Sequence, residues 1–173
     1  PANAAWTLRP NAYIYKTNTF NSNDASQFFL TNSNAQGSGS LTSTILQSPA
    51  FTLSGFTTAN LSFYHHLNYQ GGETAIVEIS TNGISWAPVA GGNYTASVGA
   101  SNGFVAANLN LDAYAGQATV YIRFRYDDAI WKGWWAIDNV SITGNMNTSI
   151  TWTQAPAAPA TISANSLVIA AWR

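Results

Sequence analysis

Acidic and aromatic residues lie close together between residues 118 and 142, in the stretch ATVYIRFRYDDAIWKGWWAIDNVSI. Aromatic faces stack on the apolar C–H faces of sugar rings, and neighbouring acids and amides hydrogen-bond sugar hydroxyls. This composition therefore predicts a ligand platform, with a solvated turn and a buried Trp as the alternatives. The candidate residues are Tyr126, Trp131, Trp134, Asp127 and Asp128.

A second candidate is Asp138, which stands among apolar residues late in the same stretch. A buried carboxylate needs a cation or several hydrogen bonds to compensate for the loss of water. Calcium takes about 6–8 oxygen ligands, and carboxylates are prominent among them. The sequence leaves two roles open for Asp138: a metal ligand, or a group that accepts backbone amides or pairs with Arg123 or Arg125.

Catalytic chemistry has little support in the sequence. His65 and His66 are adjacent, so on a strand they point to opposite faces and do not share a metal. No Gly-X-Ser-X-Gly elbow and no cysteine occur. Asp127 and Asp128 are also adjacent, which suits one turn rather than two sides of a cleft. We expect a chain that is not an enzyme.

The elements that position these residues are predicted to be strands. Apolar and polar residues alternate through 120–125 and again through 134–140, which predicts a closing β-hairpin around the candidate loop. Strands are also predicted at 59–69, 74–80, 84–89 and 103–111, with Asn82-Gly83 as a hairpin turn, Trp86 buried and 91–102 a polar loop. No helical period is present. The fold class is all-β, a jelly-roll β-sandwich of two antiparallel sheets.

Composition narrows the class of partner. Only 8% of the 173 residues are charged and the net charge is −1, which excludes the basic footprint of a nucleic-acid-binding protein. The sequence contains no run of about 18 apolar residues, so no membrane-spanning segment is predicted. A polar but weakly charged surface is common in extracellular β-proteins, and the absence of cysteine favours a bacterial rather than an animal secreted protein.

The C-terminal part has a different character. Residues 155–160 (APAAPA) have the composition of a stiff linker, and 167–172 (LVIAAW) form a short apolar run. We predict one domain over residues 1–143, followed by a linker and a partial strand over 144–173. That partial strand either begins a further module or packs on an edge of the first.

Four motifs in order carry a family resemblance: SPAFTLSG, LSFYHHLN, GGETAIVEISTNGISWAPV and VYIRFRYDDAIWKGWWAIDNVSI. Over about residues 41 to 143 the chain resembles the MAM-like jelly-roll domain of bacterial cleaved adhesins and related surface modules of Bacteroidetes-type secreted proteins. The resemblance implies a calcium ion (Ca²⁺) with a structural role. Its implied ligands are Asp138 and Asn139, where the family often has two acids, and Glu73, which matches an acid after a Gly turn.

The resemblance implies a non-catalytic adhesion or binding module of a larger exported protein, extracellular or on the cell surface. Its expected partners are a glycan, which is favoured, or a surface protein, together with other domains of the same polypeptide. Two alternatives stay open. The chain is a structural repeat of a cell-surface filament or adhesin without a small ligand, or it is an accessory domain of a secreted hydrolase.

Overall fold

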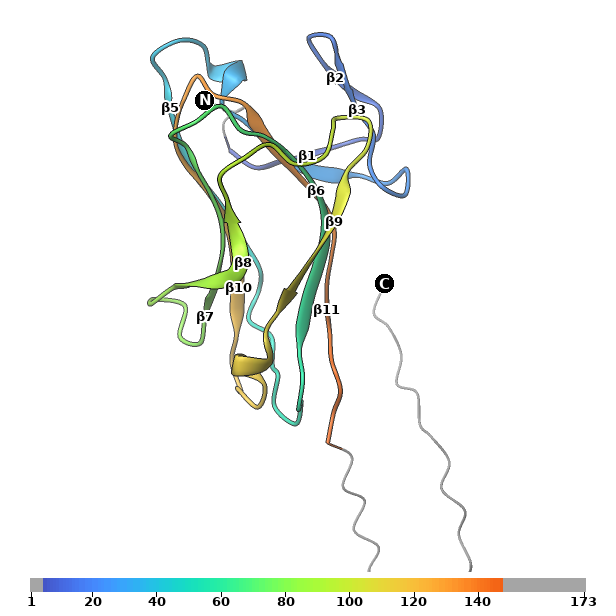
Figure 1. Cartoon of the computed structure of the whole chain (residues 1–173), viewed down its shortest axis with the longest axis vertical. Coiled ribbons are helices and arrows are strands. Elements are labelled where there is room, and N and C mark those ends of the chain that lie inside the picture. Colours follow the sequence, from blue (N-terminus) through green and yellow to red (C-terminus); the bar gives the residue numbers. More distant parts are fainter. Residues whose placement is uncertain (1–4, 148–173) are drawn as a thin grey trace, which may run out of the picture.

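The computed structural model describes residues 5–147, which form two antiparallel sheets packed face to face (Figure 1). The five-stranded sheet has the order β1-β4-β11-β6-β9, and the four-stranded sheet has the order β5-β10-β7-β8. Strands β2 and β3 form a separate two-stranded sheet. The strands are β1 (Thr7–Arg9), β2 (Tyr13–Tyr15), β3 (Asn18–Phe20), β4 (Phe28–Asn32), β5 (Leu41–Gln47), β6 (Asn60–Asn68), β7 (Thr74–Ser80), β8 (Ala87–Tyr94), β9 (Val105–Asn110), β10 (Tyr121–Ile130) and β11 (Trp134–Thr143); two 3₁₀ turns are Asn34–Gln36 and Asp112–Tyr114.

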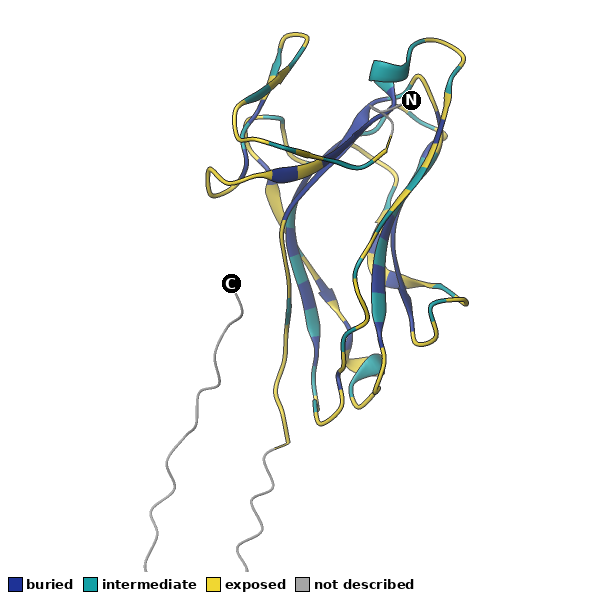
Figure 2. Ribbon diagram, turned by 180° about the vertical axis from the view of Figure 1, so that it is seen from behind, coloured by how far each residue is buried: buried dark blue, intermediate teal, exposed yellow. Residues whose placement is uncertain are grey.

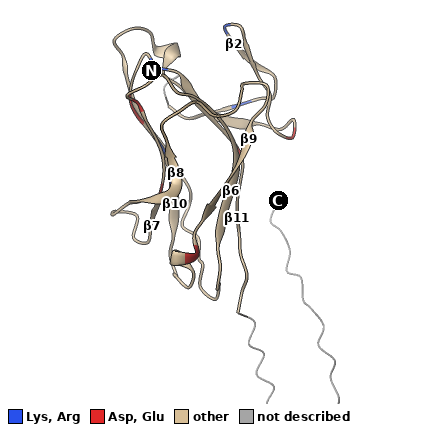
Figure 3. Cartoon of the chain, viewed as in Figure 1, with Lys and Arg blue, Asp and Glu red and all other residues tan. Residues whose placement is uncertain are grey.

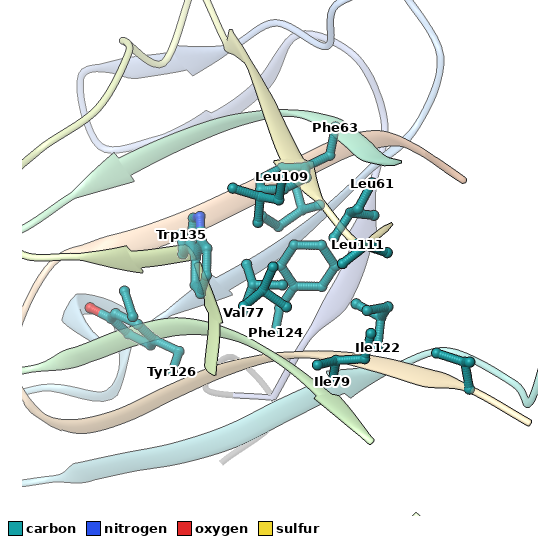
Figure 4. Packing of buried hydrophobic residues seen from close by; sticks show 14 of the residues in the cluster. Leu61, Phe63, Val77, Ile79, Leu109, Leu111, Ile122, Phe124, Tyr126 and Trp135 are labelled. Atoms are coloured by element: carbon teal, nitrogen blue, oxygen red, sulfur yellow. The ribbon is translucent and has the colours of Figure 1, made fainter. Parts of the chain in front are cut away.

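The main core fills the space between the sheets. Alternation sends every second residue inward, so Phe63 on β6, Phe124 on β10 and Trp135 on β11 meet there (Figure 4). The Phe124 ring lies 5.0 Å from Phe63 and 5.8 Å from Trp135, both nearly edge to face. This buried layer confirms the predicted all-β jelly-roll β-sandwich.

A second apolar cluster lies on the opposite face of the five-stranded sheet. Trp134 and Ala136 point away from the main core because they alternate with Trp135 and Ile137. Phe20, from the β2-β3 hairpin, packs on this face with Phe28 and Leu30 of β4. The N-terminal hairpin therefore covers apolar surface that the sandwich alone would leave in water. Four of the five residues of β4 are buried, and Figure 2 shows buried residues along the strands of both sheets.

The predicted closing hairpin is wrong. β10 pairs with β5 and β7 in the four-stranded sheet, whereas β11 pairs with β4 and β6 in the five-stranded sheet. Residues 131–133 carry the chain from one sheet to the other. Alternation identifies which residues share a face of a strand, but it does not identify the neighbouring strand, so two consecutive alternating runs looked like partners.

The remaining strand predictions fare better. Strand β7 coincides with the predicted 74–80, and β6 and β9 fall inside their predicted ranges. Strands β7 and β8 pair on either side of the Asn82-Gly83 turn. Strand β8, however, starts at Ala87 and extends to Tyr94, into the predicted polar loop, and Trp86 is only partly buried.

The predicted linker and the apolar run 167–172 lie outside the described residues, so the division at residue 143 stays a prediction. Within residues 5–147, no helix is long and apolar enough to cross a membrane. The charged residues of the described chain are few and occur at separate places along the ribbon (Figure 3).

Candidate functional site

Asp127 and Asp128 belong to strand β10 and not to a loop. The register with β5 shifts between Tyr126 and Ala129, and Asp128 has a positive φ of 56°, which marks a β-bulge. Asp127 accepts a hydrogen bond from Arg125 Nη1 at 3.2 Å, and Asp128 accepts one from the Thr74 hydroxyl at 3.3 Å. The bulge thus turns two consecutive acids toward the outer, solvent side of the four-stranded sheet.

Trp131 follows the end of β10 and is half exposed, with 50% of its surface in water. Its two apolar neighbours are also exposed: Ile130 at 52%, and Leu41, the β5 residue opposite Ile130, at 56%. The backbone amide of Trp131 donates to the Ser40 carbonyl at 3.4 Å, which ties the loop to the start of β5. Among the predicted aromatic residues, Trp131 is therefore the one available to a ligand.

Tyr126 is not part of a surface platform. Its side chain is 0% exposed and lies between the sheets, on the same face of β10 as Ile122 and Phe124 (Figure 4). Burial, reinforced by the nearby Glu73 carboxylate, raises the pKa of Tyr126 well above its usual value. The alternation of β10 already placed Tyr126 on the inner face, so the prediction failed by treating it as a loop residue.

Trp134 is also removed from the predicted platform. It is 8% exposed and packs in the second cluster, with its ring centre 5.6 Å from that of Phe20. Its indole Nε1–H donates to His66 Nε2 at 2.9 Å. A ring held by packing on one side and by a hydrogen bond at its edge has no free face for a sugar.

The two adjacent histidines point to opposite faces, as predicted. His66 uses both ring nitrogens, because Nδ1 lies 2.9 Å from the Val98 carbonyl and Nε2 accepts from Trp134. His65 accepts the indole N–H of Trp135 at Nδ1, 3.2 Å away. Burial lowers the pKa of His65 to about 4, with a smaller contribution from His66, so it is neutral at pH 7.

Asp138 sits on the outer face of β11 and is 4% exposed. Its two oxygens accept the backbone amides of Asn23 and Asn139, each at 2.8 Å. The side-chain amide of Asn139 donates to Asp24 at 2.9 Å, which places a second carboxylate nearby. Burial raises the pKa of Asp138, the two amides oppose that rise, and Asp24 adds to it. Accepting backbone amides is one of the two roles predicted for this residue.

Glu73 occupies a different place from Asp138. It precedes β7, is 4% exposed, and accepts the Gln70 amide at 2.5 Å through Oε1. Its other oxygen, Oε2, is buried without a hydrogen-bond partner, as is the Tyr126 hydroxyl. The Glu73 carboxylate is close enough to Tyr126, in the main core, to raise its pKa, whereas Asp138 lies on the outer face of the five-stranded sheet. Among residues 5–147, no three acids or histidines gather in one metal-binding group.

Sequence reasoning missed an ion-pair network on the outer face of the four-stranded sheet. Glu78 accepts Arg123 Nε at 2.7 Å and Arg125 Nε at 3.2 Å, and Arg125 also reaches Asp127. Burial would raise the pKa of Glu78, but the two arginines outweigh burial and hold the pKa below its usual value. We call these four residues the polar strip. Their spacing on β10 was visible in the sequence, but Glu78 joins them only through the β7–β10 register.

Aromatic residues close one end of the polar strip. The Arg123 guanidinium lies over the Trp86 ring, 4.2 Å from its centre, and the Tyr121 ring lies 6.5 Å from that of Trp86. The turn that carries Trp86 projects from the four-stranded sheet on the side away from the other sheet (Figure 1). A small pocket of about 180 Å³ lies beside Trp86 and is also lined by Ser85 and Tyr114. It is smaller than the roughly 300–1,000 Å³ typical of enclosed small-molecule sites.

Comparisons with known proteins identify the fold. No protein-family model matches the chain, and no curated protein sequence does. Among solved structures, the K1 cleaved adhesin domain of Lys-gingipain from Porphyromonas gingivalis W83 matches with a TM-score of 0.54 and 16% identity, over 82% of this chain and 85% of that one. The K3 cleaved adhesin domain of the same protein matches with a TM-score of 0.51 and 16% identity, over 84% and 93%.

A carbohydrate-binding module, TmCBM61 in complex with β-1,4-galactotriose, has a TM-score of 0.51 and 11% identity, over 81% of this chain and 88% of that one. These similar structures cover most of the described sandwich, and their identities are low enough that the likeness concerns architecture alone. The chain therefore has a jelly-roll fold of the cleaved-adhesin type.

Proposed function

We propose that this chain is a non-catalytic carbohydrate-binding or adhesion module of a larger exported protein, related to the MAM-like cleaved-adhesin domains. The fold supports this proposal, because the similar structures include adhesin domains and a module solved with an oligosaccharide. Fold alone does not assign function, since one architecture hosts many sites. The side chains of this chain must therefore carry the argument.

The observation that carries the proposal is the exposed indole of Trp131 beside an acid-bearing bulge. Trp131 is held at the end of β10 with 50% of its surface in water, and Asp128 lies three residues before it on the same strand end. A large aromatic surface left in water next to hydrogen-bonding groups suits the apolar face and the hydroxyls of a sugar.

A glycan array tests the proposal directly. We expect the chain to bind a subset of neutral oligosaccharides, and we expect Trp131→Ala to weaken that binding while Trp131→Phe retains part of it. Binding that is unchanged in Trp131→Ala would remove Trp131 from the site. A chain that binds no glycan at all would favour the structural-repeat alternative, in which the module spaces or strengthens a surface filament.

Calcium belongs to the same proposal as a structural ion. Asp138, Asp24 and the amide of Asn139 provide oxygen atoms at one place, and a cation there would relieve the repulsion that helps raise the pKa of Asp138. Glu73 fits a separate position, because its buried, unpartnered Oε2 belongs to a carboxylate near Tyr126 of the main core. An ion at Asp138 would hold the Asn23–Asp24 turn against β11 and would take no part in chemistry.

The place of the module in its parent protein is also proposed. The sparse charge, the polar surface and the jelly-roll fold suit an extracellular or cell-surface setting beside other domains of the polypeptide. An accessory domain of a secreted hydrolase has the same properties. Assaying the full-length parent protein for hydrolysis of the glycans that bind the module separates these two settings.

A further inference from the structure

The polar strip holds all three ion pairs found within residues 5–147, in a chain where only 8% of residues are charged. It lies on the outer face of the four-stranded sheet, and Asp127 is its one member among the residues predicted as a ligand platform. Glu78, Arg123, Arg125 and Asp127 together carry two negative and two positive charges, which cancel. Charge complementarity therefore favours a neutral ligand over an anionic one.

The strip has hydrogen-bonding capacity to spare. Arg123 donates to Glu78 through Nε alone, and neither of its terminal nitrogens makes a hydrogen bond within residues 5–147. Gln47 lies opposite Arg123 on β5, and Asn93 lies opposite Ile76 on β8, so both share this outer face. Both amides are exposed and make no side-chain hydrogen bond in the described part of the chain.

This combination matches a sugar chain. Each sugar hydroxyl can both donate and accept hydrogen bonds. It can therefore pair with the carboxylates, guanidinium groups and amides that lie together on this sheet face. Tyr121 and Asp127 are six residues apart on β10, which is about 20 Å of extended strand. That length accommodates several linked rings. The partly exposed rings of Trp86 and Tyr121 lie at one end, where Arg123 covers one face of Trp86.

We propose that the outer face of the β5-β10-β7-β8 sheet binds a neutral, extended oligosaccharide along β10. Arg123, Gln47 and Asn93 hydrogen-bond its hydroxyls, and Trp86 stacks on a terminal ring. This inference rests on the proposed carbohydrate-binding function and assigns it to the sheet face, with Trp131 contributing at most the far end of the site.

The test begins with a glycan array of neutral oligosaccharides that includes β-1,4-galactotriose, followed by titration calorimetry of the strongest binder. We expect Gln47→Ala and Asn93→Ala each to weaken binding by about 5- to 10-fold, the effect of one lost hydrogen bond. Asn102→Ala is the matched control, because Asn102 is an exposed amide in the turn before β9. We expect it to bind as the unaltered chain does.

A second measurement does not depend on variants. In the ¹H–¹⁵N spectrum, each Trp gives a separate indole signal, and we expect the ligand to shift the Trp86 signal more than the Trp131 signal. A ligand that shifts Trp131 alone, with Gln47→Ala and Asn93→Ala binding normally, overturns the sheet-face assignment and leaves the proposed function standing. A chain that binds no glycan on the array overturns both.

Discussion

The indole N–H of Trp135 donates to Nδ1 of His65 across 3.2 Å, in the middle of the main core. An imidazole nitrogen that accepts a hydrogen bond cannot carry a proton, so this contact requires the neutral ring. The Phe63 and Tyr94 rings, 5.2 and 4.6 Å away, surround His65 with apolar surface. The pair therefore links the stability of the sandwich to pH.

We predict that acid weakens the fold through His65. Burial lowers the pKa of His65 from 6.5 to about 4 in the folded chain. Between these two pKa values the unfolded chain binds a proton that the folded chain does not bind. The free energy of unfolding is therefore highest above about pH 6.5 and falls as the pH decreases toward 4. The shift corresponds to about 2 kcal/mol lost between pH 7.5 and pH 5. Urea unfolding at both pH values measures the loss.

The matched variant is His65→Phe, which keeps a buried ring and removes the titrating group. We expect its stability to depend less steeply on pH than that of the unaltered chain. Equal pH dependence in the two proteins would show that another group dominates. His66, whose pKa burial also lowers, is the first to consider, because its loss has the same sign.

A second prediction separates the two neighbouring tryptophans of the original platform. Trp134→Ala removes a ring from the second cluster and leaves His66 Nε2 without its donor, so we expect a cost of about 3–5 kcal/mol in the free energy of unfolding. Trp131→Ala removes a half-exposed ring and should change stability by less than about 0.5 kcal/mol. Chemical denaturation of both variants checks the difference, and similar losses would contradict the burial assigned to each.

These two residues also show what the sequence can predict. Period-two alternation located most strands and the inner face of β10, because side-chain direction follows from the backbone repeat alone. It did not reveal that β10 and β11 enter different sheets, since pairing depends on contacts with β5, β7, β4 and β6. Trp134 was predicted at the start of a strand and still counted in the ligand platform, although its alternation with Trp135 already indicated two opposite faces.

The candidate sites were predictable to different degrees. Asp138 was recognised as a buried acid from its apolar neighbours. The structure adds its hydrogen-bond partner Asn23, 115 positions earlier in the chain, and the nearby Asp24 carboxylate, which accepts from Asn139. The polar strip was not recognised, because Glu78 meets Arg123 only when strands 45 residues apart come into register. Local patterns indicate which face of a strand a residue occupies. Its contacts depend on which strands pair, and that pairing is long-range.

A third prediction concerns the strip as a structural unit. Glu78→Gln removes the carboxylate charge that Arg123 and Arg125 share, with Glu78 only 8% exposed at its side chain. We expect a loss of about 1–3 kcal/mol, less than for a fully buried pair because the arginines are partly solvated. Asp128→Asn is the control, since its exposed carboxylate has one long bond to Thr74. Thermal melts in which the two variants behave alike would contradict the prediction.

A fourth prediction tests calcium. If an ion binds at Asp138, chelation should lower the melting temperature, because an ion held only by the folded state stabilises it by about 2.7 kcal/mol when its concentration is about 100 times Kd. Asp24→Asn should abolish the difference, and Glu73→Gln should not, because Glu73 lies near Tyr126 of the main core and not at Asp138. Identical melting curves with and without chelator would exclude a structural ion under those conditions.

The last prediction addresses the crossing between the sheets. Gly133 lies at the point where the chain leaves β10 for β11, and its carbonyl accepts the backbone amides of Ser33 and Asn34. A Cβ atom at this position would overlap the backbone carbonyl and the side-chain oxygen of Asn68 on β6. Backbone atoms of a central strand cannot move aside cheaply, so we expect Gly133→Ala to cost at least about 1–3 kcal/mol, the usual range for overpacking.

Gly103→Ala is the matched control for that crossing, because a Cβ atom there meets nothing within 4 Å and the backbone is not left-handed. We expect it to change the free energy of unfolding by less than about 0.5 kcal/mol. Unfolding in urea, followed by Trp fluorescence, compares the two. If Gly133→Ala were as stable as Gly103→Ala, the chain would not pass as closely to Asn68 as the structure places it. The sheet-to-sheet connection that replaced the predicted hairpin would then need revision.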